Sequence, residues 1–234
     1  RRRATMVEQP ELMGAATEYV RALETALRHA EALAVAHETL GRHVANPAYY
    51  EDADESFNWL LNERGYVLYG LGRVEEGRAS LYAGAGRLEN GETNVSNIIN
   101  LSEILVTEGR AKEPPALLPK IGKASPYGNA WIETTRSCSA AQLQDADLQK
   151  AALEYLKSHE SDNPAALQRA LLCADDVDGA AALMIRRLAS LETRSAALLA
   201  VQRPRRPPVP DQPFRAVLRE RYERMLSRDD VRAA

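Results

Sequence analysis

Apolar residues along the segment from Glu11 to His43 recur at close to the 3.6-residue period of an α-helix. They form one stripe, made of Leu12, Ala16, Val20, Leu23, Leu27, Ala30 and Ala34. Because no Gly or Pro lies between Ala15 and Leu40 to mark a turn, the segment is either one long helix or two helices. We expect a flexible tail at 1–10 and an N-terminal helical segment at 11–45.

The dipeptide Asn46-Pro47 ends this helical segment, and an acidic loop is expected at 46–56. The loop carries four carboxylates, Glu51, Asp52, Asp54 and Glu55. They are most simply explained as a solvated loop that helps to start the next helix. A cation site is the alternative, but the spacing and the glycine of an EF-hand are missing.

From Phe57 onward the helical pattern repeats. The first unit has a helix at about 57–71, a turn at Gly72-Arg73 and a second helix at about 74–88. Gly72 has its counterpart in Gly109, at an offset that also matches two leucines, Leu68 and Leu105. Self-similarity at a period of about 20 to 50 residues is typical of stacked structural units.

Two further units follow with weaker similarity. One runs from Trp131 to about His159, and the next from Pro164 to about Leu188. One more helix is expected at 191–202, so the repeats occupy 57–203. Abundant Ala and Leu, with only two Phe and two Trp, favour helices over strands throughout the chain.

These positions resemble the tetratricopeptide repeat (TPR), whose pattern places bulky and small residues at fixed intervals. The first unit carries Leu61, Gly65, Leu68, Gly72, Gly77, Leu81 and Gly84 at the matching places. The second carries Ile98, Leu101, Ser102, Leu105, Gly109, Leu118 and Pro126. We expect Gly65 and Gly77 to lie where the two helices of one hairpin cross. Pro114 stands at a small-residue position and predicts a short, late-starting second helix in unit two.

The resemblance implies an all-α fold, a right-handed superhelix of stacked antiparallel helical hairpins that forms a TPR-like α-solenoid. It also implies a concave groove, lined by the first helix of each hairpin, that receives a partner protein or peptide. Mapped onto this chain, the groove is lined by Trp59, Asn62, Tyr66, Tyr69, Asn100, Glu103, Asn129, Glu133 and Arg136. The alternative for Trp59 and Tyr66 is that both rings pack against the N-terminal helical segment.

Beyond the repeats, a Pro-rich linker is expected at 204–213, extended because each proline disfavours helix. A C-terminal amphipathic helix and tail are expected at 214–234. The apolar stripe of this helix needs a partner surface, which is either the end of the repeat stack or another protein. Contact with a second copy would make the chain a homo-oligomer.

Charge and length exclude some classes of protein. With 30 Lys and Arg against 33 Asp and Glu, the net charge of −3 shows no basic excess for binding nucleic acid. No apolar stretch reaches the roughly 20 residues of a membrane span. A location in the cytoplasm or in the periplasm is equally compatible with the chain.

No catalytic, cofactor-binding or metal-ligating motif is recognised, so we expect a protein that is not an enzyme. The alternative is a helical accessory or substrate-recruiting domain of a larger enzyme. Cys138 and Cys173 lie at nearly equivalent points of adjacent units. Packed helix axes lie about 8 to 10 Å apart, beyond the reach of a disulfide, so buried thiols are favoured over a bond between them.

Overall fold

The computed structural model describes residues 1–89, 91–202 and 212–234. These residues are mostly helical, which confirms the predicted all-α class. They divide into two compact units, the first from Arg1 to Leu101 and the second from Ser102 onward. The division falls within helix α6 (Val95–Thr107), which contributes residues to both units.

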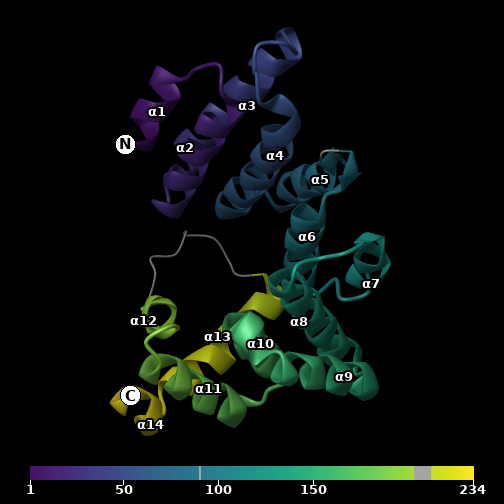
Figure 1. Cartoon of the computed structure of the whole chain (residues 1–234), viewed down its shortest axis with the longest axis vertical. Helices are drawn as coiled ribbons and strands as arrows, with labels where there is room; N and C mark the ends of the chain where they lie inside the picture. The colour runs from purple at the N-terminus through teal and green to yellow at the C-terminus, as the bar shows by residue number, and fades with distance from the viewer. Residues whose placement is uncertain (90, 203–211) are drawn as a thin grey trace. The chain divides into compact units, whose positions relative to one another are not determined.

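The first unit consists of consecutive helices that pack as antiparallel neighbours (Figure 1). Helix α2 pairs with α3, and α4 pairs with α5. The elements are α1 (Arg2–Glu8), α2 (Met13–Thr25), α3 (His29–Ala45), α4 (Ala53–Gly70), α5 (Val74–Ala85), β1 (Leu88–Glu89), β2 (Glu92–Thr93) and the start of α6.

The second unit continues the pattern of packed neighbours, with α8 against α9 and α10 against α11. Helix α7 and the 3₁₀ turn η1 are short, as Pro114 predicts. The elements after α6 are α7 (Pro114–Leu117), η1 (Leu118–Lys120), α8 (Pro126–Leu143), α9 (Ala146–Ser158), η2 (Glu160–Asp162), α10 (Pro164–Cys173), α11 (Val177–Ala189), α12 (Arg194–Val201), α13 (Pro213–Leu226) and α14 (Asp229–Ala233). The predicted linker at 204–213 lies almost wholly outside the described residues.

The N-terminal helical segment is two helices, because the chain turns at Leu27 with φ +58°. The turn resets the helical phase. In α3 the buried alanines are Ala32 and Ala36. The predicted stripe positions Ala30 and Ala34 are exposed instead. One continuous stripe through both helices was therefore a wrong expectation.

Two shorter segments also differ from expectation. Residues 1–10 contain helix α1, which packs on α2 and is linked to it by an ion pair between Arg2 and Glu18 at 3.3 Å. The expected acidic loop ends earlier than 56, because Asp54 and Glu55 lie in the first turn of α4. Carboxylates there interact favourably with the positive end of the helix dipole.

Asp52 has a structural role that the sequence did not reveal. Its two carboxylate oxygens accept hydrogen bonds from the backbone N–H groups of Met13 and Gly14, at 2.7 and 2.8 Å. The hydroxyl of Ser56 donates to the same carboxylate at 2.8 Å. Asp52 thus satisfies two amides at the start of α2 that have no partner within the helix.

Five connections between consecutive helices of the described residues use the same backbone turn. One residue adopts a positive φ, and the next residue donates its N–H to the carbonyl five positions before it, at 2.8 to 3.0 Å. This is the bonding of a Schellman motif. Among the described residues the turn occurs at Leu27, Gly72, Gly109, Gln144 and Asp175.

Gly65 and Gly77 lie where α4 and α5 cross, as predicted. A Cβ atom on Gly65 would stand 2.6 Å from Cγ of Leu81 and 3.2 Å from the carbonyl oxygen of Gly77. A Cβ on Gly77 would stand 3.0 Å from the carbonyl oxygen of Gly65. The two glycines therefore permit direct backbone contact between the helices.

Helix α5 ends at Ala85, earlier than expected, and a short hairpin follows in which Leu88 pairs with Thr93 and Glu89 with Glu92. Asn58 holds this segment on α4. Its amide donates to the carbonyl of Leu88 at 3.1 Å, and Arg87 donates to its side-chain oxygen at 3.1 Å. These contacts replace the helical hydrogen bonds that the last predicted turn of α5 would have made.

Cys138 of α8 and Cys173 of α10 form a disulfide with their Cα atoms 5.0 Å apart. The expectation of separate thiols was wrong because it compared helix axes with a limit that applies to Cα atoms. Cα atoms lie about 2.3 Å from the axis, so two that face each other approach about 4.6 Å closer than the axes do.

The C-terminal helix α13 packs against α10 and α11 of its own unit. Met225 is fully buried there, together with apolar residues of α10 and α11, and Leu218, Tyr222 and Leu226 pack around it. The stripe predicted for this helix therefore has its partner surface within the same chain.

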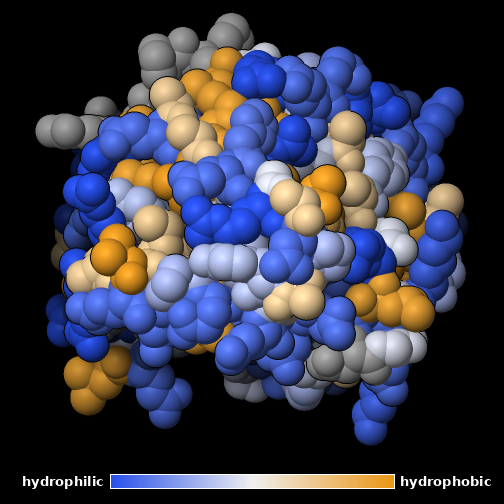
Figure 2. All heavy atoms as spheres, turned by 90° about the horizontal axis from the view of Figure 1, so that it is seen from above, coloured by the Kyte–Doolittle hydropathy of each residue, from blue (hydrophilic) through white to orange (hydrophobic). Residues whose placement is uncertain are grey.

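None of the helices in the described part of the chain combines the length and the hydropathy needed to cross a membrane. The face drawn in Figure 2 is mostly hydrophilic, and hydrophobic residues appear on it in small separate groups.

Candidate functional site

Within the first compact unit, residues 1–101, the predicted groove residues lie on α4 and α6. Each of these is the first helix of its hairpin. Trp59, Tyr66 and Asn100 are half-buried, whereas Asn62 and Tyr69 are buried at 2% and 7% exposure. The three half-buried side chains keep part of their surface toward solvent. They remain the members of this set that can contact a partner directly.

Trp59 lies beside Arg21 of α2, whose guanidinium carbon is 6.0 Å from the ring centroid. This distance is at the limit of a cation–π interaction. Arg21 also donates to Glu63 of α4 at 3.0 Å and to Glu18 at 2.7 Å. The indole of Trp59 therefore lies beside a charged group of the N-terminal helical segment. This agrees in part with the alternative that the ring packs against that segment.

Arg21 and Glu63 were not found by sequence reasoning. They are 42 positions apart, and no local pattern connects residues at that distance. A weak signal existed for Glu63 alone, because it lies one helical turn after Trp59 on α4. Together these residues form the first-helix face of the first unit, which we define as Arg21, Trp59, Glu63, Tyr66 and Asn100.

Side-chain amides link α4 to α6 beneath this face. Asn100 donates to the side-chain oxygen of Asn62 at 3.1 Å, and Asn62 donates to Glu63 at 3.4 Å. One turn earlier, Asn97 donates to the carbonyl of Asn58 at 3.0 Å. Asn62 thus positions its neighbours, since its polar atoms bond within the protein.

Tyr69 belongs to the hairpin rather than to the face. A Cβ atom on Gly77 of α5 would stand 2.9 Å from Cδ2 of its ring, so the ring packs directly on that glycine. Its burial is a consequence of this contact.

The electrostatics of the face are set by carboxylates around Arg21. Burial alone would lower the pKa of Arg21, but the hydrogen bond that Arg21 donates to Glu63 and the charges of Glu63 and Glu18 raise it. Burial and the neighbouring charge of Glu63 raise the pKa of Glu24. Arg21 is therefore held charged, while Glu24 is a carboxylate that the fold makes easier to protonate.

The predicted groove residues of the second compact unit each contact another polar group of the same unit. Glu133 and Arg136 form an ion pair within α8. The oxygen of Glu103 lies 3.7 Å from Arg169 of α10, a residue that the sequence reasoning missed. Asn129 donates to the carbonyl of Ala124 at 3.5 Å, a long hydrogen bond. These side chains are half-buried and already have partners within the protein, so a partner molecule would have to compete with these contacts.

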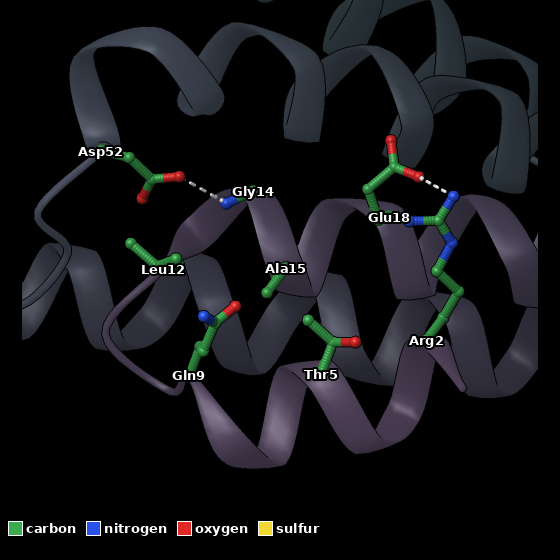
Figure 3. Close-up of a pocket in the computed structure, with 8 residues that line it drawn as sticks. All are labelled: Arg2, Thr5, Gln9, Leu12, Gly14, Ala15, Glu18 and Asp52. Carbon is green, nitrogen blue, oxygen red and sulfur yellow. Dashed lines mark hydrogen bonds and ion pairs between the residues drawn. The ribbon is translucent and has the colours of Figure 1, made fainter.

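A pocket of about 260 Å³ lies between α1 and α2 of the first unit (Figure 3). Its charged groups already have partners within the protein. Asp52 accepts the two backbone amides of α2, and Glu18 pairs with Arg2. Thr5 of α1 and Gln9, which follows α1, line the pocket together with Ala15 of α2. The pocket is a weaker candidate than the first-helix face, because none of the described residues that line it is aromatic.

Within the described ranges, no group of three or more His, Cys, Asp or Glu side chains is arranged to hold a metal ion. Comparisons with known proteins add no assignment: no protein-family profile, no curated protein and no solved structure matches this chain.

Proposed function

We propose that this chain is a non-catalytic binding or scaffold module of TPR-like architecture. Its hairpins stack into a right-handed superhelix, and a partner protein or peptide binds along the groove formed by the first helices. The observation that carries the proposal is the shared hairpin turn at Leu27, Gly72, Gly109, Gln144 and Asp175. The turn is common at helix ends, but here it recurs between helices that pack on each other, α4 with α5, α8 with α9 and α10 with α11, which fits a chain of stacked hairpins.

The first-helix face supports binding of a polypeptide rather than a small molecule. Trp59 and Tyr66 supply aromatic surface, and aromatic residues are enriched among those that dominate the affinity of protein interfaces. Arg21 and Glu63 form a hydrogen-bonded charged pair beside Trp59. The proposal does not include nucleic acid as a partner, because carboxylates outnumber cations around Arg21.

Photo-crosslinking tests this proposal. A benzophenone amino acid replaces Trp59, and in a matched control it replaces Ala83, an exposed residue of α5. In a lysate of the source organism, we expect covalent adducts with polypeptide at position 59 and few at position 83. Equal labelling at the two positions, or none at either, would contradict the proposal.

Substitution of the same face gives a second readout. We expect Trp59→Ala and Tyr66→Ala to reduce partner capture while helical content stays intact. Loss of the cooperative melt in either variant would show that the rings serve the core. Because α13 already packs on its own chain, a homo-oligomer through this helix is not part of the proposal.

A further inference from the structure

The disulfide of the second unit lies in a small apolar cluster covered by α13. Val106, Cys138 and Cys173 are buried at 1%, 1% and 2% exposure. The partly buried side chains packed against them are Phe214 and Leu218, both from α13. Because these two are the described members of the cluster that meet solvent, a reductant reaches the sulfurs by displacing α13.

The same helix also holds the backbone beside Cys173. Helix α10 ends at Cys173, so its last carbonyl groups have no partner within the helix. Arg221 of α13 donates to the carbonyls of Leu172 and Cys173, at 2.9 and 2.8 Å. Its guanidinium also lies 3.2 Å from Asp175, in the turn that follows.

We call this surface the α13 seat: Val106, Cys138, Cys173, the carbonyl of Leu172, and Asp175. Further contacts extend the docking of the helix beyond the seat. Arg224 lies 3.2 Å from Asp175, and Gln168 of α10 donates to the sulfur of Met225 at 3.1 Å. Both cysteines of the disulfide are thus part of the surface on which α13 packs.

Reduction changes the seat directly. Two thiols occupy more space than two bonded sulfurs, and a close-packed cluster has no free volume to absorb the difference. The cluster can expand most easily at its partly buried members, which belong to α13. Reduction also removes the covalent link that holds the end of α10 against α8, and that end carries the carbonyls bound by Arg221.

We propose that α13 and the Cys138–Cys173 bond form a thiol-responsive latch. Docked α13 shields the bond from thiol reductants, and reduction releases α13 from its seat. The two effects are thermodynamically linked. If the disulfide stabilises the docking of α13 by some free energy, docking of α13 stabilises the disulfide by the same free energy.

The chemistry is thiol–disulfide exchange with a small dithiol or with two monothiols. A thiolate attacks one sulfur, the Cys138–Cys173 bond breaks, and a mixed disulfide forms. A second thiolate then resolves that bond, which leaves two protonated cysteines and one oxidised reductant. An oxidising compartment keeps the latch closed, and a reducing compartment opens it.

The rate of reduction tests the first half of the proposal. The full-length oxidised protein is treated with dithiothreitol under native conditions, and released thiols are counted over time. We expect Arg221→Gln to accelerate reduction about tenfold, because it removes charge-assisted hydrogen bonds that hold α13 closed. The matched control is Arg186→Gln, an exposed arginine of α11 that pairs with Glu160 away from the seat and should leave the rate unchanged.

Hydrogen exchange tests the second half. We expect reduction to raise the exchange rate of residues 213–226 about tenfold or more, with a smaller change in α11. If Arg221→Gln melts without cooperativity, Leu218→Ala replaces it in the rate measurement.

Three results would overturn the proposal. One is equal reduction rates in wild type and in the α13 variant, and another is unchanged exchange of 213–226 after reduction. The third is the presence of two free thiols in protein purified without reductant and exposed to air.

Discussion

Replacing Gly65 and Gly41 by alanine should have opposite effects, although both glycines lie in helix interiors of the first unit. Alanine is favoured over glycine in a helix by about 0.5–1 kcal/mol. At Gly41 an added Cβ meets nothing within 4 Å, so this gain should appear in full. At Gly65 the Cβ would stand 2.6 Å from Cγ of Leu81, a side chain that is only 1% exposed and cannot rotate into solvent.

Overpacking a core costs typically about 1–3 kcal/mol. After the propensity gain is subtracted, Gly65→Ala should destabilise the protein by about 1–2 kcal/mol. Gly41→Ala should stabilise it by about 0.5–1 kcal/mol. Urea denaturation followed by far-UV circular dichroism measures both free energies of unfolding. If Gly65→Ala is as stable as wild type while Gly41→Ala is stabilised, the helices do not cross at this glycine and the close contact of α4 with α5 is refuted.

Three further substitutions test other parts of the structure. Asp52→Ala should lower the free energy of unfolding by about 1–2 kcal/mol, since it removes a cap from α2, and a urea midpoint equal to that of wild type would exclude this role. Burial lowers the pKa of His29 from its ordinary 6.5, so the unfolded state binds the proton more readily and stability should fall as the pH drops below about 6.5. The urea midpoint of His29→Gln should depend less on pH in this range, and an unchanged dependence would assign the effect to other groups. The double variant Cys138→Ser and Cys173→Ser should lower the free energy of unfolding by about 4 kcal/mol, because the disulfide no longer restricts a loop of 35 positions in the unfolded chain. The double variant should therefore melt at a lower temperature than the oxidised protein, and equal melting temperatures would contradict this estimate.

The hairpins could be predicted where residue type reports backbone geometry. Gly72 and Gly109 adopt φ +74° and +82°, which glycine does at little cost, and both turns were found from the sequence. Gly65 and Gly77 were identified by the same logic, because only close approach explains glycine inside a helix. The crossing of α4 and α5 was thus readable before the structure.

The candidate site was harder to predict from the sequence, because its contacts join residues that are far apart in the chain. Trp59 and Asn100 were assigned to the first helices by mapping the groove that the resemblance implies onto this chain. The partner of Trp59 is Arg21 of α2, and the partner of Asn100 is buried Asn62. A charged residue on an amphipathic helix is ordinarily solvated, so neither Arg21 nor Glu63 carries a local signal that it will pair across helices.

The remaining turns show why the later helical hairpins are hard to recognise from the sequence. Leu27, Gln144 and Asp175 adopt φ of +58°, +59° and +58°, a region that costs an L-residue roughly 1–2 kcal/mol relative to the right-handed helix. Such a conformation persists only when the surrounding packing over-determines it. At these hairpins the turn is therefore specified by the burial of the flanking helices, and the residue at the turn is free to vary. Hairpins that share backbone dihedrals and buried helix faces, but not residue types, leave little residue pattern for a sequence comparison to match, although the hydrogen bonding of the five turns is the same.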